Sequence, residues 1–359
     1  MKREVIKKVL KIIIFLSIFM ILFCTLGVFF NPTGTINEWF QSYTVIEFYK
    51  EKENSIDVLY VGNSCVYTGI SPMEIYKNAG ITGYSFSTSG QKIISSYYFI
   101  KEALKYQSPK VVFLEIGEAF SKKEDNGELN TRRAIDSFKF SKLKLEMILD
   151  SDYGLSGFDK LSCIFPLLRY HSRWSNLDES DFRKFINKDI YTYKGYLLDG
   201  KVKEYTKKVD KHFKKEIDNQ EELKEELAKI PNEVNEKIDK IIEVCNQNDC
   251  KLIFIKIPEP KLWSNEKHEI ISEYAKEKNI DFIDLNYDDK INIDWQNDTQ
   301  DGGDHLNIFG AEKVATYLSK YLQNNFNLED HRNDPNYESW NDLLVKYDEA
   351  KENRIKDKK

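Results

Sequence analysis

The stretch Ile56-Asp57-Val58-Leu59-Tyr60-Val61-Gly62-Asn63-Ser64 decides how the rest of the chain is interpreted. Its apolar run has the length and composition of a buried β-strand, and it ends in a Gly-Asn turn followed directly by a serine. In open parallel sheets, ligands bind beyond the carboxyl ends of the strands. Ser64 is therefore a candidate nucleophile at the edge of a sheet.

A second motif, Asp301-Gly302-Gly303-Asp304-His305-Leu306-Asn307, lies far downstream. A serine hydroxyl needs a general base, and His305 is the candidate because its imidazole titrates near neutral pH. A carboxylate would then orient the ring. Asp301 is favoured because two glycines let it fold back onto the histidine, and Asp304 is the alternative acid. The sequence thus predicts a catalytic Ser64–His305–Asp301 triad.

Strands and helices alternate around these two motifs. Near-continuous apolar runs predict strands buried on both faces of a parallel sheet. A serine before Pro72 and an asparagine before Ile308 are typical residues at the start of a helix. The expected strands cover residues 56–61, 83–87, 110–116, 251–257 and 280–285, and the expected helices begin near Pro72, Ile93, Asn265 and Asn307.

This alternation stops between about residues 120 and 248, where the chain is charge-rich and has helical spacing. We therefore expect one α/β domain, residues 56–325, with a large helical insertion at about 120–248. A linker, 31–55, precedes the domain. The charged tail, 326–359, is expected to be peripheral or partly disordered.

The N-terminus carries an uninterrupted apolar run of 19 residues, Ile12 to Phe30. A membrane-spanning helix needs about 20 such residues, so we predict an anchor at 12–30. The bulky Phe29-Phe30 pair does not suit a signal peptidase, although a cleaved export signal is the alternative. Basic residues in the segment 1–11 predict a cytoplasmic N-terminus and a domain on the extracellular side.

Composition excludes several classes of function. The formal net charge is −6 with acids and bases interspersed, so we expect no nucleic-acid partner. No second histidine or cysteine stands near His305 at ligand spacing, and no phosphate-binding or dinucleotide-binding motif is present. The sequence therefore predicts neither a metal site nor a cofactor.

Other residues are candidates for the surroundings of the triad. The backbone N–H groups of Ser64 and Gly90 are the expected oxyanion donors. In the insertion, His171 and Arg173 are predicted to face the substrate, and the alternative is a helix end with Arg173 in a surface ion pair. Trp263 follows the strand at 251–257 and is a third candidate for substrate binding.

Gly62-Asn63-Ser64, Gly90 and the Asp301–Asn307 segment together resemble the SGNH/GDSL hydrolase superfamily. The resemblance implies a flavodoxin-like three-layer fold with a serine nucleophile, a glycine oxyanion donor and a late acid and histidine. Three positions depart from the family pattern, and the first is Asn63, which stands where the family usually has an aspartate. Gly302 stands where the family places its acid, and Gly117-Glu118-Ala119-Phe120 lacks the third-strand asparagine, so a third oxyanion donor must come from elsewhere.

The anchor and the segment Gly69-Ile70-Ser71-Pro72 are similar to the membrane-tethered branch of that superfamily. That branch includes the D-alanyl-lipoteichoic acid transfer proteins and the alginate O-acetylation proteins, which work beside membrane-bound O-acyltransferases. The resemblance implies an extracellular serine esterase or O-acyltransferase of the cell membrane, acting on envelope polysaccharide or teichoic acid, with a membrane-bound O-acyltransferase as a partner. The alternative is a catalytically silent scaffold that binds an envelope polymer or such a partner.

Overall fold

The computed structural model describes residues 2–35, 39–121, 127–186, 192–206, 230–287 and 291–356. Its centre is a sheet in which every neighbouring pair of strands is parallel, in the order β2-β1-β3-β4-β5. The predicted α/β fold class, a flavodoxin-like parallel sheet between helices, is confirmed. The strands are β1 (Val58–Gly62), β2 (Gly83–Ser87), β3 (Val111–Glu115), β4 (Lys251–Lys256) and β5 (Asp281–Asp284).

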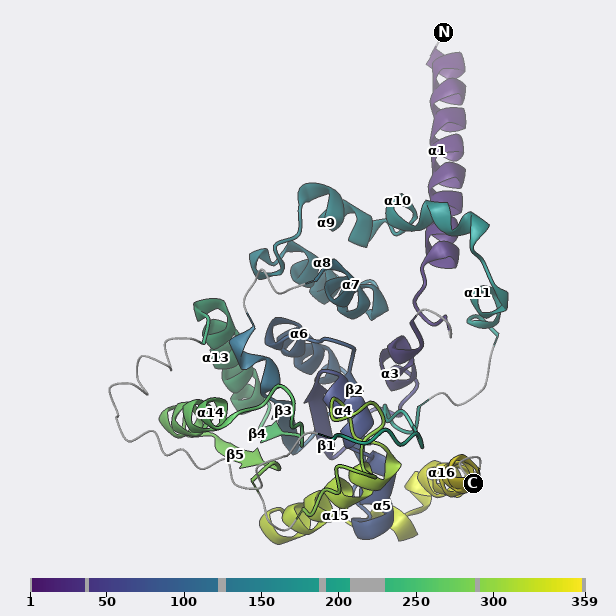
Figure 1. Cartoon of the computed structure of the whole chain (residues 1–359). Coiled ribbons are helices and arrows are strands. Elements are labelled where there is room, and N and C mark those ends of the chain that lie inside the picture. Colours follow the sequence, from purple (N-terminus) through teal and green to yellow (C-terminus); the bar gives the residue numbers. More distant parts are fainter. Residues whose placement is uncertain are drawn as a thin grey trace.

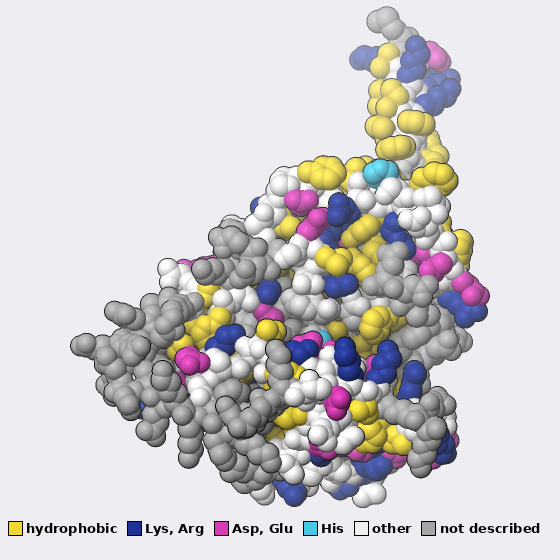
Figure 2. All heavy atoms as spheres, in the orientation of Figure 1, with side chains coloured by type: hydrophobic (Ala, Val, Ile, Leu, Met, Phe, Trp, Pro, Cys, Tyr) yellow, Lys and Arg dark blue, Asp and Glu magenta, His cyan; other side chains and the backbone are white. Residues whose placement is uncertain are grey.

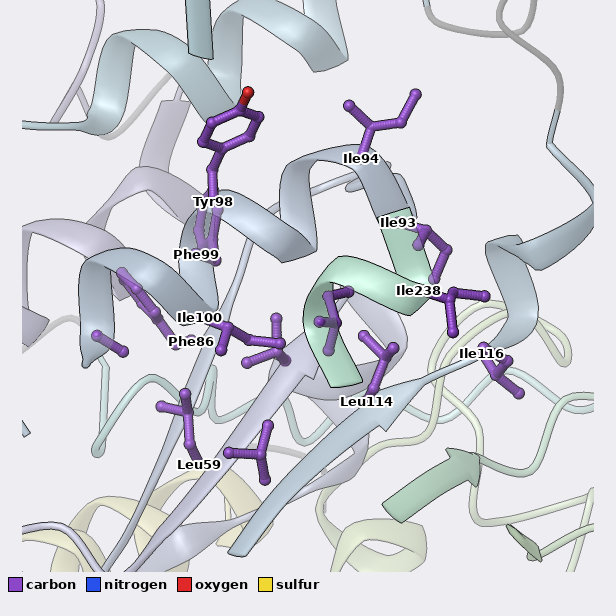
Figure 3. Packing of buried hydrophobic residues seen from close by; sticks show 14 of the residues in the cluster. Leu59, Phe86, Ile93, Ile94, Tyr98, Phe99, Ile100, Leu114, Ile116 and Ile238 are labelled. Carbon is purple, nitrogen blue, oxygen red and sulfur yellow. The ribbon is translucent and has the colours of Figure 1, made fainter. Parts of the chain in front are cut away.

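Helices cover both faces of the sheet, as Figure 1 shows. On one face, Leu59 and Leu114 pack against α6 (Ile93–Ala103) and α13 (Asn232–Gln247), with α14 (Asn265–Glu277) alongside. Figure 3 shows this core, in which Ile238 of α13 packs over the strands. On the other face, Val58 and Tyr60 pack against α5 (Pro72–Ala79) and α15 (Ile308–Asn325). The alternation of side chains along β1 thus supplies both cores.

The two predicted helix starts are confirmed at the level of single hydrogen bonds. The Ser71 side chain accepts from the backbone N–H of Glu74 at the start of α5, and Pro72 occupies the first helical turn. The Asn307 side chain accepts from the backbone N–H groups of Phe309 and Gly310 at the start of α15. Both caps satisfy donors that the first turn of a helix leaves unpaired.

The strand order places the end of β1 at a special point of the sheet. β1 lies between β2 and β3, so the chain leaves it toward one side and returns on the other. Ligands bind at such switch points in open α/β sheets, outside the carboxyl ends of the strands. Ser64 begins the short helix α4 (Ser64–Gly69) directly at this point.

The described part of the long segment between β3 and β4 is mostly helical, although residues 192–206 are not. Residues 122–126, 187–191 and 207–229 of this segment lie outside the described residues. In Figure 1, α7 to α9 lie above α6, and α10 and α11 lie beside α1 (Lys2–Phe30). The helices are α7 (Glu128–Ser137), α8 (Lys142–Leu149), α9 (Gly157–Ile164), α10 (Leu167–Tyr170) and α11 (Glu179–Arg183).

Two segments outside the predicted domain, the linker and the tail, contribute to the packed fold. In the predicted linker, α3 (Tyr43–Phe48) stacks the ring of Phe48 on that of Phe86, with 4.2 Å between their centroids. In the charged tail, α16 (Glu338–Lys356) buries Trp340 and Tyr347 against the α5 side. The prediction of a peripheral tail was wrong because these few apolar residues pack on a surface formed by distant parts of the chain.

Helix α1 is long and apolar enough to cross a membrane, with a mean hydropathy of 2.9 in its most apolar window. The last turns of α1 contact the insertion. Gly27 is buried there, and α1 packs on α10.

Candidate active site

Ser64 is held at the sheet edge by the two residues before it. A Cβ on Gly62 would lie 2.5 Å from the Cβ of Glu115, so only glycine lets the ends of β1 and β3 come this close. The side chain of Asn63 accepts from the backbone N–H of Cys65 at 3.0 Å and caps α4. Together they make Ser64 the first residue of a helix that starts at the strand end.

His305 is positioned by a loop that folds back so that its first residue, Asp301, contacts the histidine. Gly302 and Gly303 have φ angles of +79° and +98°, which residues with a Cβ rarely adopt. Oδ1 of Asp301 accepts from the backbone N–H groups of His305 at 2.9 Å and of Asp304 at 3.1 Å. The loop therefore returns the carboxylate to the imidazole, as its glycines suggested.

One hydrogen-bonded chain joins the three predicted residues. Oδ2 of Asp301 lies 2.5 Å from Nδ1 of His305, and Nε2 of His305 lies 2.7 Å from Oγ of Ser64. An ionised carboxylate only accepts, so Nδ1 carries the proton and Nε2 is free to accept from the serine hydroxyl. This is the order of atoms that general-base activation of a serine requires.

The local environment keeps Asp301 ionised. Partial burial alone would raise the pKa of its carboxyl, but the hydrogen bonds from the side chain and backbone of His305 outweigh burial and hold that pKa below its usual value. The alternative acid, Asp304, is engaged elsewhere, because its carboxylate accepts from Nζ of Lys261 at 2.8 Å. The geometry thus selects Asp301 of the two candidates.

Gly90 lies on the same edge, three residues after β2. Because Gly62 pairs with Ser87, the segments that lead to Ser64 and Gly90 leave the sheet side by side. Gly90 has a φ of +62°, and a Cβ there would lie 2.3 Å from Nδ2 of Asn130 on α7. The insertion therefore brings a side-chain amide against the predicted oxyanion glycine.

Two further polar side chains accompany this amide. NH1 of Arg133 donates to Oδ1 of Asn130 at 3.3 Å, which leaves Nδ2 of Asn130 available as a donor. Nε of Arg133 is buried without an acceptor, and this guanidinium has no carboxylate partner among the described residues. Burial lowers the pKa of Arg133. Tyr67 stands beside the hydroxyls of Ser89 and Ser64, and its burial raises the pKa of the phenol to about 12, although both hydroxyls act in the opposite direction.

Charged side chains form hydrogen bonds and ion pairs at the carboxyl ends of the strands next to Ser64. Glu118 stands near the position where the resembled family has its third-strand asparagine, and it accepts from Nδ2 of Asn63 at 3.2 Å and from Nζ of Lys92 at 2.7 Å. Lys256 at the end of β4 is fully buried between Glu115 and Glu259, at 2.9 and 2.8 Å. Burial would lower the pKa of this ammonium, but the two carboxylates raise it well above its usual value.

The structure does not bring Trp263 to the site. Its side chain is buried, and its indole N–H donates to Oδ2 of Asp284 at 2.6 Å. The ring also lies beside the buried ammonium of Lys256, 5.4 Å from its centroid. The prediction of a substrate-binding role was wrong because Trp263 fills the core under β4 and β5.

His171 and Arg173 lie against the end of α1. NH1 of Arg173 donates to the carbonyl of Phe30 at 2.7 Å, and its guanidinium pairs with Asp181 at 3.0 and 3.1 Å. Nδ1 of the exposed His171 lies 3.2 Å from the nearby carbonyl oxygen of Leu168. The substrate-binding prediction for Arg173 was therefore wrong, whereas that for the exposed His171 stays a prediction. Arg173 caps the carboxyl end of a helix, where the dipole favours a cation.

A second serine, histidine and aspartate also lie in a row on β5 and α14. Nδ1 of His268 lies 2.8 Å from Oδ2 of Asp284, and Ser272 lies 3.4 Å from its Nε2. Here the serine is inside a helix and no glycine loop adjoins it. His268 is thus a useful control for His305.

The described residues contain no cluster of three or more His, Cys, Asp or Glu side chains arranged to hold a metal ion. Their five cysteines are all free thiols.

Comparisons with known proteins find no matching family model and no matching curated protein. Two solved structures overlay with this chain at 12% sequence identity. A "putative acylhydrolase" from Bacteroides fragilis has a TM-score of 0.36 and covers 80% of this chain and 96% of its own. A GDSL-like lipase from Bacteroides thetaiotaomicron has a TM-score of 0.35, with 79% and 97% covered. Overlays at this identity and TM-score decide neither family nor activity.

Proposed function

We propose that this protein is a serine esterase or O-acyltransferase of the SGNH type, acting through Ser64, His305 and Asp301. The observation that carries the proposal is the continuous chain of hydrogen bonds from Asp301 through His305 to Ser64 at the switch point of the sheet. A hydroxyl, an imidazole and a carboxylate in this order activate a serine for attack on an ester carbonyl.

In the first half-reaction, Oγ of Ser64 forms a bond to the carbonyl carbon of the ester while its proton moves to Nε2 of His305. The resulting tetrahedral oxyanion collapses, the ester C–O bond breaks, and His305 returns the proton to the leaving alcohol. Asp301 stabilises the imidazolium during this step. In the second half-reaction, a water or sugar hydroxyl repeats the sequence and releases Ser64.

The backbone N–H groups of Ser64 and Gly90 and the Nδ2 amide of Asn130 are the proposed donors to the oxyanion. The close approach of Asn130 to Gly90 supports the third of these. Asn130 would then supply, from the insertion, the donor that the third strand lacks. Such preorganised donors act on the charge that develops in the transition state.

We further propose that α1 is an uncleaved anchor and that the domain lies outside the cytoplasm. Length and apolar composition support the anchor, and the basic residues that precede it support this orientation. Side chains of the insertion also bind the carboxyl end of α1. Lys184 donates to the carbonyls of Phe29 and Asn31 at 2.6 Å, and Arg173 to that of Phe30 at 2.7 Å. If α1 were a signal that is cleaved and removed, Lys184 and Arg173 would lose the backbone carbonyls of α1 that they bind.

The acceptor in this location would be an envelope polymer, with a membrane-bound O-acyltransferase as the proposed source of acyl groups. Arg133 lies beside Asn130 and has no carboxylate partner among the described residues, which favours teichoic acid over a neutral glycan, because a guanidinium binds a phosphate group in a directed way.

Labelling of the full-length protein in detergent with a fluorophosphonate probe tests the proposal. The wild-type protein should be labelled at Ser64, and Ser64→Ala should abolish the label. Ser272→Ala, which removes the serine beside His268, should leave it unchanged. Folded wild-type protein that resists the probe under all conditions would favour a scaffold without catalysis.

A further inference from the structure

The insertion contacts α1 well before the apolar run ends. The ring of Phe165 lies 5.9 Å from that of Phe23, and a Cβ on Gly27 would lie 3.2 Å from the backbone nitrogen of Leu167. A helix rises about 1.5 Å per residue, so Phe23 lies roughly 10 Å along the axis from Phe30. If the run that ends at Phe30 fills the hydrocarbon layer, Phe165 lies within that layer as well.

Helix α9 buries a side that contacts a guanidinium, and it exposes apolar side chains on another side. NH1 of Arg132 lies 2.8 Å from Oγ of Ser162 and 2.9 Å from Sγ of Cys163, both on the inner side. On the outer side, Phe158 is 58% exposed and Leu161 is 46% exposed. A surface helix in water places its apolar side inward, so this arrangement suits an apolar surrounding.

The apolar exposure continues along the insertion toward α1. Figure 2 shows hydrophobic side chains gathered where the N-terminal helix leaves the globular part. Trp174 is 71% exposed, and tryptophan is typical of the boundary between lipid and water. Six residues of the insertion have exposed apolar side chains, and we call them the lipid-facing residues: Phe158, Leu161, Trp174, Phe182, Phe185 and Ile186.

A pocket of about 710 Å³ lies between α1 and the insertion. Met20 and Phe23 of α1 form one wall, and Phe140 and Phe165 of the insertion belong to the other. This volume falls within the usual range for small-molecule sites. Because Met20 lies deeper along α1 than Phe23, the pocket reaches the level of lipid acyl chains.

We propose that the lipid-facing residues are immersed in the membrane leaflet on the domain side, and that the pocket takes an acyl chain of a phospholipid from that leaflet. The insertion is then an interfacial element of the kind that buries its apolar face at the boundary of headgroups and acyl chains. The proposal depends on α1 as an uncleaved anchor and is independent of any chemistry at Ser64.

Depth measurement on the full-length protein in lipid nanodiscs tests this. Single cysteines replace Phe158, Trp174 and Phe185 in a Cys24→Ser background, since the other four cysteines are buried. The thiols carry an NBD dye, and the lipids carry a doxyl quencher near the top of the acyl chain. Val345→Cys on α16 is the matched control, because Val345 is an equally exposed apolar residue, at 60%.

The three test positions should show blue-shifted emission and loss of fluorescence with doxyl lipid, whereas the Val345 position should be quenched by iodide in solution. The substituted side chains are all more than half exposed, and unchanged thermal unfolding will confirm that each variant folds. Test positions that behave like the Val345 control would overturn the proposal. So would protection that appears only when another protein is added, because that result would make the face a protein interface.

Discussion

The hydroxyl oxygen of Ser64 lies 2.7 Å from Nε2 of His305, although 241 positions of sequence separate the two residues. The contact forms because Ser64 starts α4 and His305 stands two residues before the cap of α15, and these two helices pack together. The candidate site thus depends on how the ends of β1 and α15 meet.

Replacement of His305 by glutamine should lower esterase activity by about 10⁴-fold, because Ser64 loses its proton acceptor. The matched variant is His268→Gln, which removes a histidine that also bonds an aspartate but lies outside the site. That variant should retain activity within about twofold, as expected for a position away from the reacting atoms. Rates of p-nitrophenyl acetate hydrolysis provide the measurement, and equal losses in the two variants would contradict the assignment.

Asn130→Ala should reduce kcat by about 10²–10³-fold, the usual cost of one oxyanion donor, with a much smaller change in KM. The control is Asn246→Ala, at an exposed position of α13. Steady-state kinetics separate the two constants. A change confined to KM would show that Asn130 binds substrate rather than the oxyanion.

Arg133→Gln should abolish a preference for anionic esters. A charged hydrogen bond contributes about 1.5–3 kcal/mol, so wild-type kcat/KM for an anionic ester should exceed that for its neutral analogue by roughly ten- to a hundredfold. p-Nitrophenyl hemisuccinate and p-nitrophenyl acetate test an anion on the acyl side, and 4-acetoxybenzoate and phenyl acetate test one on the alcohol side. Arg169→Gln, which removes an exposed arginine paired with Glu128, should leave both ratios unchanged. Identical ratios in wild type and Arg133→Gln would remove the case for an anionic acceptor.

Gly62→Ala should destabilise the protein by about 1–3 kcal/mol, as overpacking in a well-filled core does, and should displace Ser64. The new methyl group would meet the Cβ of Glu115 at 2.5 Å. Gly157→Ala is the control, since no heavy atom lies within 4 Å of a Cβ at that position. Thermal unfolding in detergent compares the two, and a neutral result for Gly62→Ala would show that β1 and β3 can separate at this end.

The stability difference between wild type and Asp301→Asn should shrink as the pH falls. The pKa of Asp301 is lower in the folded protein than in the unfolded chain, so its ionised form stabilises the fold above the unfolded value of about 3.9. That contribution is lost as the pH falls through the lower folded pKa. Unfolding temperatures of both proteins at neutral pH and near pH 3 give the measurement. A difference that grows in acid would mean that the folded protein raises this pKa instead.

Strands and helix caps that depend on residues close in sequence could be predicted from the sequence. The predicted β2 at 83–87 has the observed bounds, and the capping residues Ser71 and Asn307 were identified because a cap involves only the next three residues. The order of Ser64, Gly90 and the His305 loop also followed from the alternation of strands and helices, since parallel strands bring their carboxyl ends to one edge.

Residues whose partners are distant were not predictable. Arg173 and Trp263 have polar groups that suit a substrate, but their partners are the carbonyl of Phe30 and the carboxylate of Asp284. Asn130 and Arg133 carried no signal in a charge-rich insertion. Tyr67 alone could have been suspected, because it follows Ser64 by three positions on one helix.

The strands, the helix caps, the apolar N-terminal helix and the residues able to form a serine–histidine–aspartate chain could be identified from the amino-acid sequence, because these depend on side-chain type and local spacing. Long-range packing selects Asp301 rather than Asp304 as the partner of the imidazole, places Asn130 against Gly90, and sets Arg173 at the end of α1. These contacts join segments that local propensity does not connect. They form only when burial of the two cores fixes where each segment lies.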